Sequence, residues 1–223
     1  MGSGFTGYGA PTSEQVSAMG GDRVIQLPGQ SCCCENVSEW SRHDEEETPM
    51  SDEAGGFQQY FQYLNRITFR GRLYKRLISS PILFLCARAF GSRLAEVGSG
   101  TGAGVLGAFP SWVVGFEINP FAVDYSKRVG LRVSLIEEGG LFPAADGSFD
   151  ACVLDNVLEH IADPQKVLDE CWRITGPRGG LVIAVPGSRG FAGDPDHKVF
   201  YGEEELRALD RRWTLGKLSE TST

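Results

Sequence analysis

The stretch LAEVGSGTGAG, residues 94–104, decides the fold. A short apolar run leads into glycines at every second position from Gly98 to Gly104. A glycine-rich loop after a strand lets the backbone approach a nucleotide closely, because glycine has no Cβ and adopts positive φ angles. The stretch therefore predicts a strand, a nucleotide-binding loop and the start of a helix.

Outward from this loop, apolar runs alternate with helical patterns. We expect strands at residues 92–97, 112–118, 132–136, 149–156 and 179–185, and helices at 102–109, 120–130 and 163–175. Asp163 is the expected N-cap of the last of these helices, Pro164 its first residue and Gly176 its end. The alternation predicts an α/β fold: a doubly wound, Rossmann-like, mostly parallel sheet with helices on both faces. A loop at 186–200, a helix at 202–209 and a strand at 213–219 follow.

Charge divides the chain into three parts, which we take as 1–55, 56–91 and 92–223. The net charge is −8 over residues 1–56, +7 over 57–93 and −7 over the rest. Residues 1–55 are rich in Gly, Ser and acids and show no periodicity, so we expect a disordered acidic extension. Met50 opens MSDEAGG like a natural start, so residues 1–49 are interpreted as an extension from an upstream codon. Cys32–Cys34 lack partners at ligand spacing, and metal binding there is not favoured.

The basic segment carries a roughly helical apolar stripe that includes Phe57, Tyr60, Leu73 and Leu77. We prefer the interpretation that one or two helices pack on the domain with their basic side chains in water. Peripheral contact of residues 57–77 with a membrane or an anionic substrate stays open. No signal peptide or membrane span is evident, so the cytoplasm is the expected location.

The glycine loop alone does not identify the nucleotide. Residues 98–103, GSGTGA, satisfy the dinucleotide pattern, and Glu117 stands where a carboxylate bonds ribose hydroxyls. NAD and S-adenosylmethionine both carry that ribose. Glu96 discriminates, since a carboxylate before the first glycine repels a pyrophosphate but suits an ammonium and a sulfonium.

Three segments in order, EVGSGTG (96–102), EEGGLFPAADGSFD (137–150) and VLEHIADP (157–164), resemble the class I S-adenosylmethionine-dependent methyltransferases, especially their small-molecule, type 11-like branch. The resemblance covers roughly residues 92–210. It implies S-adenosyl-L-methionine as cofactor and a small-molecule or lipid-linked acceptor. The family completes its sheet with a C-terminal antiparallel hairpin, for which residues 213–223 suffice only in part, so we expect an incomplete hairpin.

The resemblance also implies a cofactor site along one rim of the sheet. Its expected members are Glu96, Gly98, Ser99, Gly100, Gly102, Glu117, Ile118, Glu137, Glu138, Asp155 and Asn156. Glu137 stands where the family has an Asp that reaches the adenine amino group, and Glu138 is the alternative. Asp155 and Asn156 lie beside the expected methyl position.

His160 is the first candidate for a base that takes the acceptor's proton, and His197 is the second. Tyr201 is a further candidate for the acceptor pocket. Quinone-pathway O-methyltransferases hold a metal with an acid-x-x-Glu-His run, but Asn156 replaces the acid here, so metal dependence is not favoured and no metal-binding residue is assigned.

Two other functions stay open: a catalytically inactive S-adenosylmethionine-binding module, and an NAD-dependent oxidoreductase, which Glu96 disfavours. No NPPY-like run follows the fourth strand, which disfavours methylation of DNA bases or protein glutamine. The acidic catalytic part makes nucleic acid an unexpected substrate.

Overall fold

The computed structural model describes residues 23–27, 53–65, 69–209, 212 and 214–215. The strands are β1 (Arg23–Leu27), β2 (Leu94–Val97), β3 (Val113–Glu117), β4 (Val133–Leu135), β5 (Ala151–Asp155), β6 (Gly180–Ala184) and β7 (Thr214–Leu215). The α-helices are α1 (Glu53–Asn65), α2 (Phe69–Tyr74), α3 (Ser80–Arg88), α4 (Val105–Ala108), α5 (Pro120–Arg128), α6 (Gln165–Thr175), α7 (Ser188–Ala192) and α8 (Glu203–Ala208). A π-helical turn, η2 (Lys75–Ser79), joins α2 to α3, and a 3-10 turn, η3 (Leu158–His160), follows β5.

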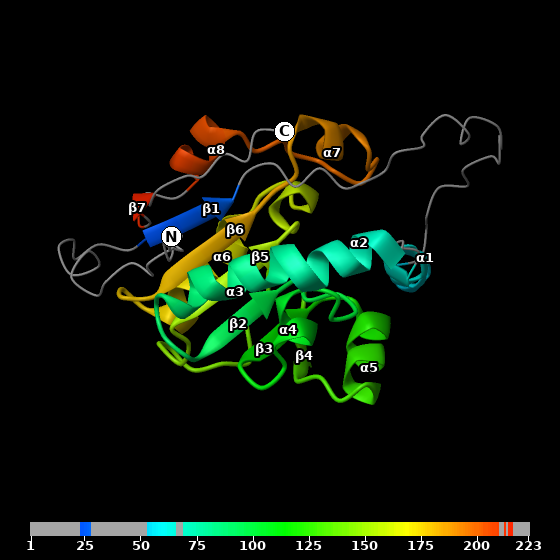
Figure 1. The fold of residues 1–223 in the computed structure, drawn as a ribbon, viewed down its shortest axis with the longest axis horizontal. Coiled ribbons are helices and arrows are strands. Elements are labelled where there is room, and N and C mark those ends of the chain that lie inside the picture. Colours follow the sequence, from blue (N-terminus) through cyan, green and yellow to red (C-terminus); the bar gives the residue numbers. More distant parts are fainter. Residues whose placement is uncertain (1–22, 28–52, 66–68, 210–211, 213, 216–223) are drawn as a thin grey trace, which may run out of the picture.

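The strands form one parallel sheet in the order β4-β3-β2-β5-β6-β1-β7. From β2 the chain first adds strands on one side, β3 and β4, and then on the other, β5 and β6. This reversal places the carboxyl ends of β2 and β5 at a topological switch point, where open α/β sheets bind ligands. The expected Rossmann-like fold is confirmed, and Figure 1 shows α3 crossing one face of the sheet.

Alternating side chains of the strands supply two separate cores. On one face Val97, Leu154 and Ile183 pack with Leu168 and Ile174 of α6. The other face contributes Leu94, Val153, Val182 and their neighbours, which pack against helices α3, α4 and α5. Strands that are buried on both faces read as continuous apolar runs, which is why the sequence pattern identified them.

The helix ends follow the chemistry of their terminal residues. Gly130 and Gly176 have φ angles of 85° and 70°, so each provides the left-handed residue that follows a helix. The predicted N-cap of α6 is one residue off, because Pro164 occupies that position. Asp163 still accepts from the Gln165 N–H through Oδ1 at 3.2 Å. Helix α7 was not predicted, because residues 186–200 had been interpreted as a loop.

The N-terminal parts depart from two expectations. Within the segment expected to be disordered, β1 pairs in parallel with β6 and β7; residues 1–22 and 28–52 lie outside the described part. The predicted helices of the basic segment are present, but the stripe does not pack as expected. Leu73 and Leu77 are 44% and 63% exposed, whereas Leu83 and Ala87 of α3 are fully buried.

At the C-terminal end, β7 is a two-residue strand within the predicted strand at 213–219, and it runs parallel to β1. Among the described residues no antiparallel strand pairs with the sheet. Residues 216–223 are not described. No described helix is both long and apolar enough to cross a membrane.

Candidate cofactor and acceptor site

The glycine loop leaves β2 at the switch point in a conformation that glycine alone adopts easily. Gly98, Gly100 and Gly102 have φ angles of 69°, 53° and 74°. A Cβ on Gly98 would lie 2.6 Å from Cγ2 of Val157, so the loop and the segment after β5 touch there. The space beside Gly98 therefore has no room for a side chain.

Glu96 holds the loop in place from beneath. Its buried carboxylate accepts the N–H groups of Val105 at 3.0 Å and Leu106 at 2.6 Å, which are the first two residues of α4. Burial raises the pKa of Glu96 to about 7, while the hydrogen bond from Leu106 acts in the opposite direction. The structure thus gives Glu96 the role of fixing the loop, and direct contact with a cofactor stays a prediction.

Glu117 ends β3 and faces the loop. It accepts the Gly100 N–H at 2.6 Å through Oε2 and the Asn119 N–H at 2.9 Å through Oε1. Burial raises the pKa of its carboxyl group, and these hydrogen bonds lower it. The next residue, Ile118, is 39% exposed, so an apolar surface lies beside the carboxylate. This pairing suits a ribose hydroxyl next to an adenine ring.

Two buried oxygens at the carboxyl end of β5 have no hydrogen-bond partner: Oδ1 of Asp155 and Oδ1 of Asn156. Oγ of Ser99 also has none, but it lies against Gly115 of β3. Asp155 follows Leu154, whose register partner is Val97, so it lies beside Gly98. Asn156 has a φ of 55° and is the only non-glycine residue with positive φ in the described chain. Buried acceptors without donors are costly, and a ligand with an ammonium group would satisfy them. The residues present therefore fit S-adenosylmethionine, whose amino acid end carries that group.

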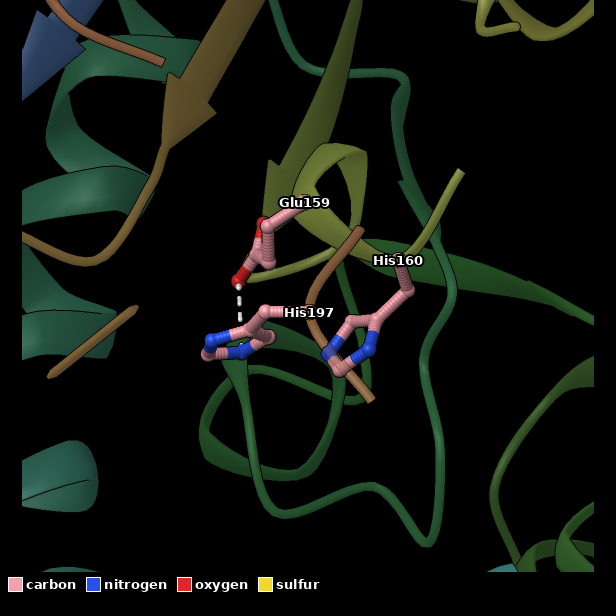
Figure 2. Close-up of side chains that lie close together, drawn as sticks. All are labelled: Glu159, His160 and His197. Atoms are coloured by element: carbon pink, nitrogen blue, oxygen red, sulfur yellow. Dashed lines mark ion pairs between the residues drawn. The ribbon is translucent and has the colours of Figure 1, made fainter. Parts of the chain in front are cut away.

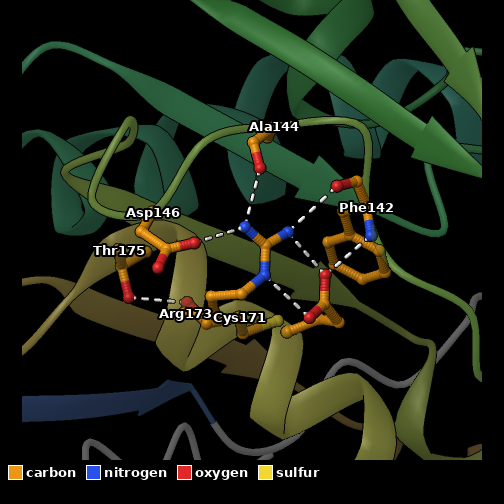
Figure 3. Close-up of polar contacts among 7 residues, drawn as sticks. Phe142, Ala144, Asp146, Cys171, Arg173 and Thr175 are labelled. Carbon is orange, nitrogen blue, oxygen red and sulfur yellow. Dashed lines mark hydrogen bonds and ion pairs between the residues drawn. The ribbon is translucent and has the colours of Figure 1, made fainter.

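Glu137 and Glu138 follow β4 and are exposed, so the structure leaves their role in binding adenine a prediction. The segment after them is anchored firmly by Arg173 of α6 (Figure 3). The Arg173 guanidinium donates to the carbonyl oxygens of Phe142 and Ala144 at 2.9 and 2.7 Å. It also pairs with Glu170 and Asp146, each at 2.7 Å. Arg173 thus fixes the wall that follows the predicted adenine contacts.

His160 and His197, predicted as alternative bases, lie together. Their ring centroids are 4.7 Å apart although the residues come from different segments, η3 and the connection between α7 and α8. Nδ1 of His160 lies 3.1 Å from Oδ2 of Asp196, and Nδ1 of His197 lies 2.9 Å from the carbonyl oxygen of Phe191. Because a carboxylate and a carbonyl only accept hydrogen bonds, each Nδ1 carries the proton in the neutral ring and each Nε2 is the basic atom.

Glu159, which was not among the predicted site residues, lies beside the two histidines (Figure 2). It is 1% exposed, neither carboxylate oxygen has a hydrogen-bond partner, and burial raises its pKa to about 7. Oε1 of Glu159 lies 3.9 Å from Nε2 of His197 (Figure 2). The predicted pocket residue Tyr201 is also buried, and Glu159 contributes to raising its pKa after burial itself.

Helices α1 and η2 add three residues that sequence reasoning did not assign to the site. Lys75 Nζ pairs with Oδ2 of Asp155 at 3.2 Å. Tyr60 packs edge-on against His160 at 6.2 Å between ring centroids, and Tyr63 donates to Oδ2 of Asp194 at 3.0 Å. The basic segment thus forms one wall of the site. No spacing rule links Lys75 or Tyr60 to the rim, so the sequence could not reveal these contacts.

Comparison with known proteins agrees with this geometry. Residues 95–183 match the family model described as a methyltransferase domain. The chain is 33% identical over 127 residues to a demethylmenaquinone methyltransferase of Renibacterium salmoninarum, covering 53% of this chain and 50% of that protein. An uncharacterised methyltransferase of Mycolicibacterium vanbaalenii is 35% identical over 100 residues, covering 42% and 38%.

A crystal structure of a SAM-dependent methyltransferase from Archaeoglobus fulgidus is similar in fold, with a TM-score of 0.51 and 21% identity over 67% of this chain and 71% of that one. The chain spans half or less of the length of the two curated relatives. Together these matches favour a methyltransferase over an NAD-dependent oxidoreductase. Residues 95–183 therefore match the methyltransferase domain family, whose cofactor is S-adenosylmethionine, and the fold agrees with the class I S-adenosylmethionine-dependent methyltransferases.

Proposed function

We propose that this chain transfers a methyl group from S-adenosylmethionine to an oxygen or nitrogen atom of a small-molecule or lipid-linked acceptor. The observation that carries the proposal is the pair of histidines beside the switch point, each of which has an acceptor at Nδ1. The cofactor, when bound, supplies a methyl group on a positively charged sulfur. The chain's own task is to align the acceptor and take up its proton, where alignment alone contributes about 7–11 kcal/mol in well-oriented reactions.

His160 is the proposed base, because Asp196 holds its ring through Nδ1 and leaves Nε2 to accept the proton. His197 is the alternative base, since its ring is fixed by the Phe191 carbonyl oxygen and by stacking on the Phe191 ring at 5.3 Å. Tyr60 packs against His160 from α1 and helps to exclude water from that side.

A transfer assay tests the function. Protein incubated with methyl-tritiated S-adenosylmethionine and a cell extract should label the small-molecule or lipid fraction, not nucleic acid. Replacing the base, His160→Gln or His197→Gln, should lower the rate by about 10²–10⁴-fold, whereas the exposed Glu204→Gln on α8 should not change it. Cofactor binding without any transfer would contradict the proposal and identify an inactive binding module.

We also propose that the surface formed by α2, η2 and α3 binds an anionic membrane. Leu77, Ile78 and Leu85 are 63%, 48% and 68% exposed there, and exposed Arg76 lies among them. Apolar side chains next to arginines suit a surface of anionic lipids. The similarity to a protein named as a demethylmenaquinone methyltransferase supports an acceptor of that chemical kind.

Vesicle flotation tests this contact. The full chain should float with vesicles of phosphatidylcholine and phosphatidylglycerol and less with phosphatidylcholine alone. Leu77→Glu should reduce binding about tenfold, because the exposed leucine no longer inserts into the lipid and the new carboxylate is repelled by the anionic headgroups. The control Val129→Glu, at a 55% exposed site at the end of α5, should bind like the unaltered protein. Equal flotation of both variants would rule out this surface.

A further inference from the structure

Three side chains with metal-binding atoms converge on the acceptor side of the rim (Figure 2). Glu159 and His160 come from η3, and His197 comes from the connection between α7 and α8. One ligand atom from each lies within 4.8 Å of the other two. The two segments are tied together at this point, because Lys198 and Val199 donate their N–H groups to the Glu159 carbonyl oxygen at 2.7 and 3.1 Å.

Both imidazoles have the hydrogen bonds that metal-binding histidines have. Nδ1 of His160 lies against Asp196 and Nδ1 of His197 against the Phe191 carbonyl oxygen. In metal sites this second hydrogen bond fixes the tautomer and turns Nε2 toward the ion. The stack of the Phe191 ring on His197, with an angle of 22° between the rings, restrains that imidazole further.

Glu159 supplies an independent reason to place a cation here. Its side chain is 1% exposed, and neither carboxylate oxygen accepts a hydrogen bond. The neighbouring cation, Lys75, lies against Asp155, at 3.2 Å. Two further acids lie near the cluster: Oδ2 of Asp194 is 3.9 Å from Nε2 of His197, and Oδ2 of Asp196 is 3.1 Å from Nδ1 of His160. A buried carboxylate without donors is rare in proteins unless an ion or a water satisfies it.

We propose that Glu159, His160 and His197 form a binding site for a divalent transition metal ion, zinc in the first place. Two imidazoles and one carboxylate are a donor set of zinc sites that keep a fourth position open, and they do not suit magnesium or calcium. Around a tetrahedral zinc ion, ligand atoms lie about 3.3 Å apart. The Glu159–His197 pair at 3.9 Å is close to that spacing.

Metal dependence was not favoured from the sequence, because Asn156 stands where an acid would be needed. The third ligand is His197, which lies far along the chain and is brought in by the fold. An ion at this place would lower the pKa of an acceptor hydroxyl bound at its open position and so take over the proton-removing role proposed for His160. The binding itself does not depend on the proposed methyl transfer.

Metal titration of the EDTA-treated full chain tests the site, with zinc, cobalt and magnesium chlorides as probes. The starting protein carries Cys32→Ser, Cys33→Ser and Cys34→Ser, which removes the cysteine cluster as a competing zinc ligand. We expect one zinc ion per chain by calorimetry, a visible absorption spectrum of low-coordinate cobalt, and no comparable binding of magnesium.

Glu159→Gln and His197→Gln should each weaken zinc binding by at least about 100-fold, while the exposed Asp124→Asn should not. If Glu159→Gln does not fold, His160→Gln on the more exposed ring replaces it in the comparison, with circular dichroism as the check. Zinc should also raise the melting temperature of the starting protein but not of His197→Gln. Zinc binding that is absent, or unchanged in the Glu159 and His197 variants, would overturn the proposal. Neither result depends on methyl transfer, so the two proposals fail separately.

Discussion

Arg173→Met is expected to lower the free energy of unfolding by roughly 3 kcal/mol, the cost of leaving the buried Glu170 carboxylate and two backbone carbonyl oxygens without the partly buried arginine that donates to them. Arg173 binds two backbone carbonyl oxygens, those of Phe142 and Ala144, and two carboxylates. Glu170 would keep the Phe142 N–H at 2.6 Å but lose its cation while only 7% exposed. Three of these partners, Phe142, Ala144 and Asp146, belong to the segment 142–146, so the substitution should loosen that segment.

Thermal unfolding followed by circular dichroism measures this effect, which should appear as a fall of about 10 °C in the midpoint. Arg207→Met is the matched control, since Arg207 pairs with Glu203 one helical turn away and both are about half exposed. Exposed pairs of this kind contribute about 0.3–0.5 kcal/mol. Equal losses in the two variants would show that the 142–146 wall does not depend on Arg173.

Gly98→Ala is expected to weaken binding of S-adenosylhomocysteine on the order of 100-fold, or about 2.7 kcal/mol. The alanine would have to keep a φ of 69°, which costs about 1–2 kcal/mol. Its Cβ would also lie 2.6 Å from Val157, so the loop must move away from the segment that follows β5. That movement separates the loop from Asp155 and Asn156, whose oxygens complete the proposed cofactor site.

Isothermal titration calorimetry measures the change, with Gly130→Ala as the control. Gly130 has a φ of 85° and open space around its Cα, so this substitution introduces the same backbone strain without a clash. Gly130→Ala should cost stability but leave affinity unchanged. An unaltered affinity in Gly98→Ala would show that the cofactor does not contact this part of the loop.

The parts of the fold that follow from local patterns were predictable. The strands around the glycine loop are buried on both faces and read as apolar runs, so β2, β3, β5 and β6 appear within the expected ranges. The exposed Leu77 shows where such reasoning fails, because a helical stripe gives the face of a helix but not what covers it. Strand β1 was missed because its pairing with β6 is a long-range contact without a local signal.

For the site, the family resemblance predicted the residues along the rim of the sheet, whereas the contacts on the acceptor side became visible only in the structure. The two histidines were identified separately, as alternatives, while the structure places their rings side by side. The burial of Glu159 could not be predicted from the sequence, because a single acidic residue in a loop is usually exposed to solvent. Lys75 reaches Asp155 only because η2 crosses the carboxyl end of the sheet, a placement that no spacing rule contains.

The central claim is that the rim formed by β2, β3 and β5 binds S-adenosylmethionine. Thermal unfolding of the full chain with S-adenosylmethionine, S-adenosylhomocysteine and NAD in parallel tests it most directly. At about 100 times its dissociation constant, each of the first two ligands should stabilise the protein by roughly 2.7 kcal/mol, and NAD should have no effect. Stabilisation by NAD alone, or none by either S-adenosyl compound, would contradict the account.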